Sequence, residues 1–362
     1  SYRTYLDTCT SWELIKNSTE LFVCFGGVPL KNGQICQGGT GNHYQKESII
    51  SAASSGIEFV NVSPLKSDLM DEAGGKWLSL RPNTDTALML GIAHTLHIEG
   101  LSDKDFLNKY TEGFDIFLNY LLGSNDGIQK DANWAAEICD IPANEIKELA
   151  RRMVSNRTMI SVSWSLTRQD HGEQPFWMAI MLASMIGQIG LPGGGFGFGY
   201  SATNHIGGQF TILPGAAFPQ AKNEIENFIP VARISDLLLK PNENFNFDGK
   251  KYKYPDTKIV YWAGGNPFHH HQDLNRLIKA WEKPDTIICN EWCWNTLAKR
   301  SDIVLPCTTP LERKDIMMTP RDPYVVSMSK LVDPYGQARN DYEIFTGIAK
   351  KNGGRKKIHR KS

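Results

Sequence analysis

The sequence lacks the features that mark several common classes of protein. None of its apolar runs reaches the roughly 18 residues that a membrane-spanning helix needs, so no transmembrane span is predicted. Its 39 Lys or Arg balance its 39 Asp or Glu, which leaves no net field to attract nucleic acid. Its seven cysteines form no Cys-x-x-Cys pair, and the odd number argues against a complete disulfide framework. The 362 residues are long enough for about two globular domains.

Several ligand-binding patterns are also missing. Cys289, Cys293 and Cys307 match no zinc spacing, and Cys289 is expected to be a small core residue, like Cys24. The three consecutive histidines 269–271 point about 100° apart if helical, so they cannot all bind one ion. The sequence therefore predicts no metal site and no hydrolytic triad.

One stretch, Ser161–Tyr200, combines a polar turn, a helix expected over 173–187 and a glycine-rich segment. Glycine permits close approach of the backbone to a ligand or to another part of the chain. A flexible linker is the alternative, but Phe196, Phe198 and Tyr200 alternate with the glycines, and a linker would not bury three aromatic side chains. This segment is therefore expected to pack.

The chain contains an internal repetition. Residues 21–31 read LFVCFGGVPLK and residues 259–269 read IVYWAGGNPFH, and both are buried-strand runs that end in Gly-Gly-x-Pro. Backbone N–H groups exposed at such a turn favour a phosphate or pyrophosphate, although neither turn is a Gly-x-Gly-x-x-Gly or a Walker loop. A tight turn without a ligand is the simpler alternative for each turn taken alone.

The repetition continues after each turn. A helix is expected next, then a second strand and a third strand, at 57–62 and 77–80 in the first copy and at 286–289 and 302–305 in the second. Strands that alternate with helices indicate parallel β-α-β units, whose ligands bind at the carboxyl ends of the strands. The predicted fold class is α/β, with two Rossmann-like doubly wound domains and mostly parallel sheets.

The rest of the chain is assigned to packing and connections. Apolar spacing indicates helical segments at 88–98, 103–121 and 133–139, and Asp140 is expected to cap a helix that has Pro142 in its first turn. Residues 223–254 are expected to form an exposed excursion or hairpin. The predicted domains are 1–205 and 206–350, followed by a basic tail at 351–362 that is expected to be disordered.

Polar residues follow both third strands. Asp85 has the chemistry to accept the N–H groups of guanine, and Arg313 the chemistry to clamp a phosphate. Taken singly, Asp85 is more simply the N-cap of a helix that starts near Ala87. His270 is expected to have a polar role beside the Asn266 turn.

Longer motifs resemble one enzyme family. WSLTRQDHGEQPFWM and GQIGLPGGGFGFGY within 164–200, AGGNPFHHHQDLNRL at 263–277, SDIVLP at 301–306, LERKDI at 311–316 and ARNDYEIF at 338–345 are similar to the dimethyl sulfoxide reductase family of molybdopterin oxidoreductases. Within that family the chain resembles trimethylamine N-oxide, dimethyl sulfoxide and biotin sulfoxide reductases. The resemblance runs from about Thr10 to Lys350. It implies molybdenum bis(molybdopterin guanine dinucleotide), one dinucleotide held largely by each α/β domain, and no iron–sulfur cluster in this chain.

The resemblance also implies two sets of cofactor-binding residues. The first domain would use Gly27, Val28, Asn61, Ser63, Asn83, Thr84, Asp85, Ser165 and Arg168. The second would use Asn266, His270, Asn290, Glu291, Arg313 and Asp341. Related enzymes often have Asp at the position of Ser63, which makes that assignment a departure from the family pattern.

Other expectations concern the whole enzyme that the resemblance implies. The molybdenum-ligating serine is expected upstream of Ser1 and a barrel-like domain after about Lys350, so the chain is expected to be a central fragment, inactive by itself. The substrate would be an S-oxide or N-oxide, the electron donor a c-type cytochrome or another carrier, and the compartment the periplasm, with the cytoplasm as the alternative. The remaining alternatives are a degenerate, non-catalytic nucleotide-binding α/β module and a nicotinamide dehydrogenase, for which the sequence has no fingerprint.

Overall fold

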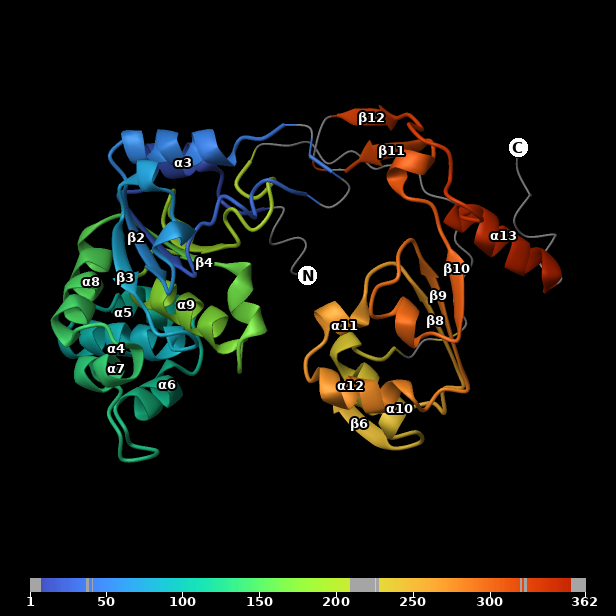
Figure 1. Cartoon of the computed structure of the whole chain (residues 1–362). Helices are drawn as coiled ribbons and strands as arrows, with labels where there is room; N and C mark the ends of the chain where they lie inside the picture. The colour runs from blue at the N-terminus through green and yellow to red at the C-terminus, as the bar shows by residue number, and fades with distance from the viewer. Residues whose placement is uncertain are drawn as a thin grey trace. The chain divides into compact units, whose positions relative to one another are not determined.

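The computed structural model describes residues 8–36, 39–40, 42–208, 225, 228–319, 321 and 324–352. The chain divides into two compact units with a parallel sheet in each (Figure 1): unit 1 comprises 1–215 and 318–325, and unit 2 comprises 216–317 and 326–362. The predicted α/β fold with parallel sheets is confirmed. The predicted boundary at 205/206 stays a prediction, because most of residues 206–227 lie outside the described part, as do 353–362 of the predicted tail.

Unit 1 contains a five-stranded sheet in the order β3-β2-β1-β4-β5, and every neighbouring pair is parallel. Its strands are β1 (Leu21–Phe25), β2 (Glu58–Ser63), β3 (Lys76–Ser79), β4 (Thr158–Val162) and β5 (Gly195–Phe198). β1, β2 and β3 lie within about one residue of the strands that the repetition predicts, whereas the sequence pattern predicts no strand at β4 or β5. Because β2 and β4 flank β1 on opposite sides, the strand order reverses at β1, where sheets of this type open a ligand crevice.

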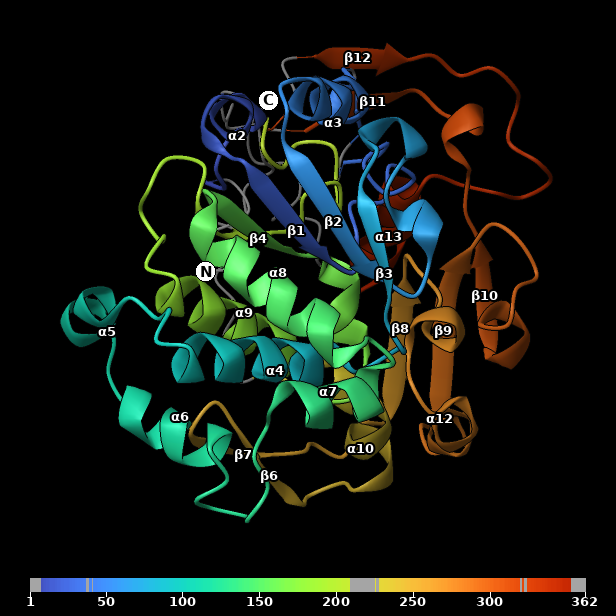
Figure 2. The same ribbon diagram turned by 90° about the vertical axis from the view of Figure 1, so that its left-hand side faces the viewer.

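Helices cover both faces of this sheet. Side chains of β1 alternate, so that Leu21, Val23 and Phe25 face one hydrophobic cluster while Phe22 and Cys24 face another. Figure 2 shows the helices of the first cluster in front of the strands. They are α4 (Asp85–Ile98), α7 (Ala132–Cys139), α8 (Ala143–Ser155) and α9 (Gln174–Met185), and α2 (Trp12–Ser18) and α3 (Gln45–Ser54) cover the other face.

Two helix predictions need correction. The segment 103–121 is two helices, α5 (Lys104–Tyr110) and α6 (Phe114–Leu121), because Gly113 adopts φ +77° and begins the second one. Asp140 does not cap α8. It ends α7 in the left-handed conformation at φ +63°, and Pro142 is the residue that precedes α8. The Asp140 carboxylate instead pairs with Arg81.

Unit 2 contains a three-stranded parallel sheet in the order β10-β9-β8. Its strands are β8 (Ile259–Ala263), β9 (Thr286–Glu291) and β10 (Ile303–Pro306). This order repeats the β3-β2-β1 part of the unit 1 sheet, although β8 is an edge strand while β1 also pairs with β4. The predicted repetition is therefore present as a repeated strand order.

The second sheet packs mainly on one face. Its core joins β9 to α10 (Ile234–Leu239), α11 (Pro267–His270) and α12 (Leu274–Trp281), and Leu277 and Cys289 are fully buried. The expected hairpin is present as β6 (Asn244–Phe247) paired with β7 (Lys250–Lys253). On the other face, the Phe345 ring of α13 (Asp341–Lys351) packs at a tilt against the Tyr261 ring, with 5.5 Å between the ring centroids.

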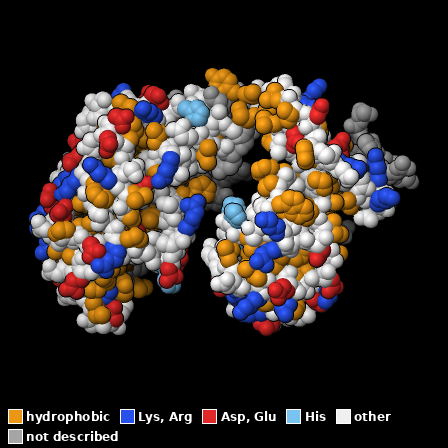
Figure 3. All heavy atoms as spheres, viewed as in Figure 1, with side chains coloured by type: hydrophobic (Ala, Val, Ile, Leu, Met, Phe, Trp, Pro, Cys, Tyr) orange, Lys and Arg blue, Asp and Glu red, His pale blue; other side chains and the backbone are white. Residues whose placement is uncertain are grey.

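Exposed hydrophobic side chains gather on a two-stranded ribbon formed by β11 (Asp315–Met318) and β12 (Val325–Met328). Ile316 and Val325 are each 65% exposed there, and Figure 3 shows hydrophobic side chains over this ribbon. Within the described residues, no helix has the length and hydrophobicity to span a membrane.

Candidate cofactor sites

The two Gly-Gly turns have the same backbone conformation. Gly26 and Gly27 follow β1 with φ of +77° and +74°, and Gly264 and Gly265 follow β8 with φ of +80° and +72°. Side chains on L-residues disfavour this left-handed conformation, so all four positions favour glycine. Each turn lies at the carboxyl end of the first strand of its sheet, as the sequence predicts.

The first turn is enclosed by neighbouring residues of unit 1. A Cβ on Gly26 would lie 2.7 Å from the Ser163 Cβ, and a Cβ on Gly27 would lie 2.5 Å from the Cβ and the carbonyl oxygen of Asp68. The N–H of Gly26 donates to the Val62 carbonyl at 2.8 Å. These glycines are therefore needed for packing between loops of unit 1.

Val28, Asn61 and Ser63, all assigned to the first site, lie close to this turn and are buried. The Val28 N–H donates to the Asp68 carbonyl, and the Ser63 hydroxyl donates to the Asp68 carboxylate, each at 2.7 Å. The Asn61 amide donates to the carbonyls of Leu65 and Lys66. These polar groups hold the loop after β2, and Asn61 also lines a cavity of about 260 Å³ beside Trp77.

Asn83, Thr84 and Asp85 follow β3 at the same edge of the sheet. Asp85 is not the N-cap of α4, because the helix begins at Asp85 and Thr84 precedes it. The Asp85 side chain is 2% exposed, and this burial raises the pKa of its carboxyl group to about 6. Asn83 adopts φ +65°, and the Thr84 hydroxyl donates to the Arg81 carbonyl.

Ser165 and Arg168 lie on the short helix η3 (Trp164–Arg168) after β4, and both are exposed. The Ser165 hydroxyl lies 3.0 Å from that of Ser163. The neighbouring Gln169 side chain hydrogen-bonds to the Asp85 carboxyl group, which joins the loop after β4 to the start of α4. The structure thus places all nine residues assigned to the first site on the carboxyl edge of one sheet.

The second turn opens into a cavity of about 570 Å³ within unit 2. Its lining includes Asn266, Asn290, Glu291, Arg313 and Asp341, which are five of the six residues assigned to the second site. The sixth, His270, is exposed on α11 and is not among the lining residues, so its role stays a prediction.

The polar side chains of this cavity are oriented by hydrogen bonds. Asn290 donates to the Asp341 carboxylate at 2.8 Å and accepts from the Tyr261 hydroxyl at 2.7 Å. Asn295 donates to the Glu291 carboxylate at 2.7 Å. Each carboxylate therefore keeps unused acceptor capacity in a fixed direction.

Arg313 is the cation of the same cavity. Its guanidinium donates to the Asp315 carboxylate at 2.9 Å and to the Thr308 carbonyl at 2.6 Å. These two bonds use only part of the five-donor fork, and they fix its plane. The remaining donors suit an oxyanion.

The second turn is open, unlike the first. A Cβ on Gly264 or Gly265 would meet no atom within 4 Å. Among the described residues, no hydrogen bond uses the N–H group of either glycine. The cavity therefore combines two free backbone donors and a guanidinium with two carboxylates, which suits a ligand that carries both anionic oxygens and N–H donors.

Comparison with known proteins agrees with this geometry. The family model for molybdopterin oxidoreductases matches residues 7–351. The chain belongs to the molybdopterin oxidoreductase family. It is 45% identical to a biotin sulfoxide reductase of Cereibacter sphaeroides over 94% of the chain and 46% of that protein. It is 44% identical to a dimethyl sulfoxide/trimethylamine N-oxide reductase of the same organism and to a trimethylamine-N-oxide reductase of Haemophilus influenzae, each over 95% of the chain and 43% of the relative.

The chain thus spans less than half the length of these relatives. A solved structure, acetylene hydratase from Pelobacter acetylenicus, aligns with a TM-score of 0.57 over 94% of this chain and 48% of that one. At 16% identity this likeness supports the fold alone.

Membership of the molybdopterin oxidoreductase family implies a molybdenum–pterin cofactor, and the residues present fit its polar groups. In unit 2 the fit rests on the free N–H groups of Gly264 and Gly265. In unit 1 the Asn61 Oδ1 atom is buried without a hydrogen-bond partner among the described residues, and a ligand donor would satisfy it. No cluster of three or more metal-binding His, Cys, Asp or Glu side chains occurs in the described part of the chain.

The glycine-rich part of Ser161–Tyr200 is packed inside unit 1. A Cβ on Gly197 would lie 2.4 Å from the Tyr200 ring. Tyr200 is 1% exposed, donates from its hydroxyl to the Thr10 carbonyl and packs edge-on against Trp12. The prediction that this segment buries its aromatic residues is confirmed for Phe198 and Tyr200, while Phe196 is half-buried.

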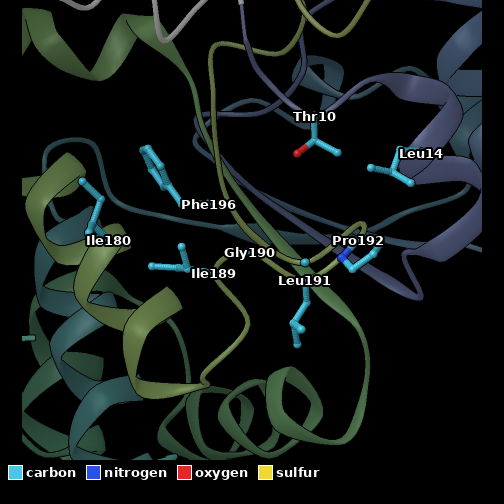
Figure 4. Close-up of a pocket in the computed structure, with 9 residues that line it drawn as sticks. Thr10, Leu14, Ile180, Ile189, Gly190, Leu191, Pro192 and Phe196 are labelled. Carbon is cyan, nitrogen blue, oxygen red and sulfur yellow. The ribbon is translucent and has the colours of Figure 1, made fainter. Parts of the chain in front are cut away.

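A further hollow of unit 1 is apolar. It has a volume of about 460 Å³, and Ile180, Ile189, Leu191 and Phe196 lie around it with no charged side chain in its lining (Figure 4). Among the described residues that line it, the Thr10 hydroxyl is the one polar side-chain group, so this hollow does not resemble the polar cavity of unit 2.

Sequence reasoning missed several residues of both sites. Asp68 and Gln169 contact the first set of residues, and Asn295 and Cys307 line the second cavity. Burial, together with the charges of Asp341 and Glu291, raises the pKa of the Cys307 thiol to about 11, which disfavours a metal-binding thiolate there. None of these residues falls in a periodic pattern, and only the hydrogen bonds reveal them.

Proposed function

We propose that this chain supplies the two cofactor-binding α/β units of a molybdenum enzyme that reduces S-oxides or N-oxides. Each unit would hold one molybdopterin guanine dinucleotide, with no iron–sulfur cluster bound by this chain. The substrate class follows from relatives at 44–45% identity that are named biotin sulfoxide, dimethyl sulfoxide and trimethylamine N-oxide reductases.

One observation carries the proposal. Two parallel sheets that share a three-strand order each end their first strand in a Gly-Gly turn of the same conformation, and each turn lies among the polar residues that the family resemblance assigns to a dinucleotide. A cofactor with two similar nucleotide ends needs two similar sites. A single nicotinamide dinucleotide would not require the second one.

The residues of unit 2 have distinct roles in this proposal. The N–H groups of Gly264 and Gly265 and the Arg313 guanidinium would bind the diphosphate. The Asp341 and Glu291 carboxylates would accept hydrogen bonds from the guanine N–H groups. Asn290 and Asn295 would keep these carboxylates in place, as they do in the structure.

In unit 1, a different set of side chains would bind the phosphates and the guanine of the other dinucleotide. Ser165 and Arg168 are exposed at the carboxyl edge and would donate to phosphate oxygens. Asp85, with a pKa of about 6, would accept from guanine in its ionised form near neutral pH.

When bound, the molybdenum cofactor supplies oxygen-atom transfer, in which two electrons and two protons reduce the oxide to a sulfide or amine and water. The residues of this chain bind and orient the cofactor in that reaction. In this proposal the chain supplies no molybdenum ligand, so we expect no N-oxide reduction by this chain alone with a reduced viologen donor.

Calorimetric titration of the purified chain with GDP tests the binding assignment. We expect Arg313→Met to weaken binding at the unit 2 site by about tenfold or more, because a charge-assisted pair with phosphate is lost. Lys279→Met, which removes one exposed positive charge from α12 away from the cavity, is the matched control and should leave binding unchanged. Absence of GDP binding, or equal effects of the two substitutions, would contradict the proposal.

A further inference from the structure

Asp68 is fixed at the first Gly-Gly turn by three contacts. Its carbonyl accepts from the Val28 N–H at 2.7 Å, and its carboxylate accepts from the Ser63 hydroxyl at 2.7 Å and the Lys31 ammonium at 3.2 Å. Its side chain is 14% exposed. A carboxylate held in this way has a defined direction before any ligand binds.

Further contacts hold the loop that carries Asp68. The Asn61 amide donates to the Leu65 and Lys66 carbonyls, and Gly27 has no side chain that would push Asp68 away. The loop continues into the short helix η1 (Lys66–Asp68). Gly27, Asn61 and Ser63 therefore all help to hold the Asp68 side chain in place.

The carboxylate of Asp68 still has acceptor capacity. Each of its oxygens accepts one of the two contacts above, and a carboxylate oxygen has two lone pairs. In sheets with this strand order, an acid at the end of the second strand accepts hydrogen bonds from ribose hydroxyls. Here the residue at the end of β2 is the neutral Ser63, and its hydroxyl is already directed at Asp68.

We propose that Asp68 is the ribose-binding residue of unit 1, where it accepts hydrogen bonds from the vicinal hydroxyls of a bound guanosine nucleotide. Ser63 and Lys31 act as positioning residues that hold its two oxygens. The inference rests on the proposed function, since it assigns one more residue to the nucleotide that unit 1 would bind.

Asp68 does not bind a phosphate group. Its negative charge would repel an anion, and the Gly26 and Gly27 N–H groups are used by the Val62 and Cys24 carbonyls. In unit 2 the corresponding N–H groups are free and an arginine lines the cavity. The first turn therefore serves the sugar side of a nucleotide, and phosphate contacts fall to the exposed Ser165 and Arg168 of the same unit.

The test compares GDP with 2′,3′-dideoxy-GDP and uses a local reporter. The Trp77 indole N–H donates to the Ser63 carbonyl at 2.8 Å, so its NMR resonance, assigned by its loss in Trp77→Phe, reports on unit 1. We expect the wild-type chain to bind GDP about tenfold more tightly than the dideoxy analogue, because hydrogen bonds to a carboxylate are lost. In Asp68→Asn, which keeps the side-chain shape, the ratio should fall to near 1.

Glu72→Gln is the matched control, since it removes one charge from an exposed side chain in the same loop and should keep the ratio. Equal discrimination by the wild type and Asp68→Asn overturns the inference and leaves the proposed function intact. If GDP shifts the Trp77 resonance but the wild-type chain binds GDP and the dideoxy analogue equally well, the inference is also overturned and the proposed function stays intact. Failure of GDP to bind the chain by calorimetry overturns the proposed function and the inference together. If Asp68→Asn has a melting temperature close to that of the wild type, the loss of discrimination between GDP and the dideoxy analogue is due to the loss of the Asp68–ribose contact and not to unfolding.

Discussion

The two Gly-Gly turns of this member of the molybdopterin oxidoreductase family share one conformation and differ in what surrounds them. Gly26 and Gly27 are packed against Ser163 and Asp68, whereas Gly264 and Gly265 face a cavity. The same four-residue pattern therefore serves loop packing in one unit and lines an open cavity in the other. Backbone conformation follows from the local sequence, but access to the turn is decided by residues far along the chain.

The units also differ in how their sheets are covered. The central strands β1 and β4 of unit 1 are buried along their whole length, whereas β3 at the edge of that sheet is partly exposed. In unit 2, Ile259 of β8 is 62% exposed and Ile303 of β10 is 45% exposed. The closed turn thus belongs to the more deeply packed sheet, and three predicted effects test whether that packing explains the difference.

Alanine substitution of the second glycine in each turn gives the largest expected contrast. Gly27→Ala should lower the free energy of unfolding by about 4 kcal/mol, because a left-handed Ala conformation adds to overpacking against Asp68. Gly265→Ala meets open space and should cost about 1 kcal/mol from conformation alone. Urea denaturation followed by circular dichroism measures both values, and equal losses would mean that the two turns are equally enclosed.

Asp85 gives a smaller effect, confined to unit 1. Burial raises its pKa from 3.8 to about 6, so the folded chain takes up the proton at a higher pH than the unfolded chain does. This group therefore destabilises the fold at neutral pH, and the cost is relieved as pH falls from about 7 to about 4. The full effect is about 3 kcal/mol.

Asp85→Asn removes this titration. The stability that it gains over the wild type should be largest at pH 7 and shrink by about 3 kcal/mol by pH 4. Asp105→Asn, at an exposed position on α5, is the control. A difference between Asp85→Asn and the wild type that stays constant across this range would show that the carboxyl group is solvated.

The smallest expected effect is the loss of ribose discrimination in Asp68→Asn, which is a tenfold change in relative affinity. This measurement tests whether the first Gly-Gly turn contributes to nucleotide binding through Asp68, the residue that packs against Gly27.

Much of the architecture could be predicted from the sequence. The apolar runs LFVCF and IVYWA with their Gly-Gly ends located β1 and β8, and the order of strand and helix indicated parallel sheets. Local capping was less predictable. Asp140 and Asp85 were both expected to be N-caps, but Asp140 adopts a left-handed conformation and pairs with Arg81, and Asp85 begins α4 in a buried position beside Gln169.

The candidate sites could be predicted where polar residues follow a strand, as Asp85 does after β3 and Arg313 after β10. Asn290, Glu291 and Ser63 lie at the ends of strands and were assigned from the family resemblance alone. Asp68 escaped prediction because it follows β2 by five positions, and only the folding back of the loop onto Gly27 brings it to the edge of the sheet. His270 was placed in the second site from its nearness to Asn266, but the short helix α11 leaves it exposed.

The guanine content of the chain tests the central claim most directly. The chain would be purified from a host that makes molybdenum cofactor and hydrolysed in acid, and the released GMP would be counted against protein. If each unit holds one molybdopterin guanine dinucleotide, GMP should approach two per chain in the wild type and one in Arg313→Met. A wild-type chain that carries no GMP, or that carries a nicotinamide dinucleotide in its place, would contradict the account.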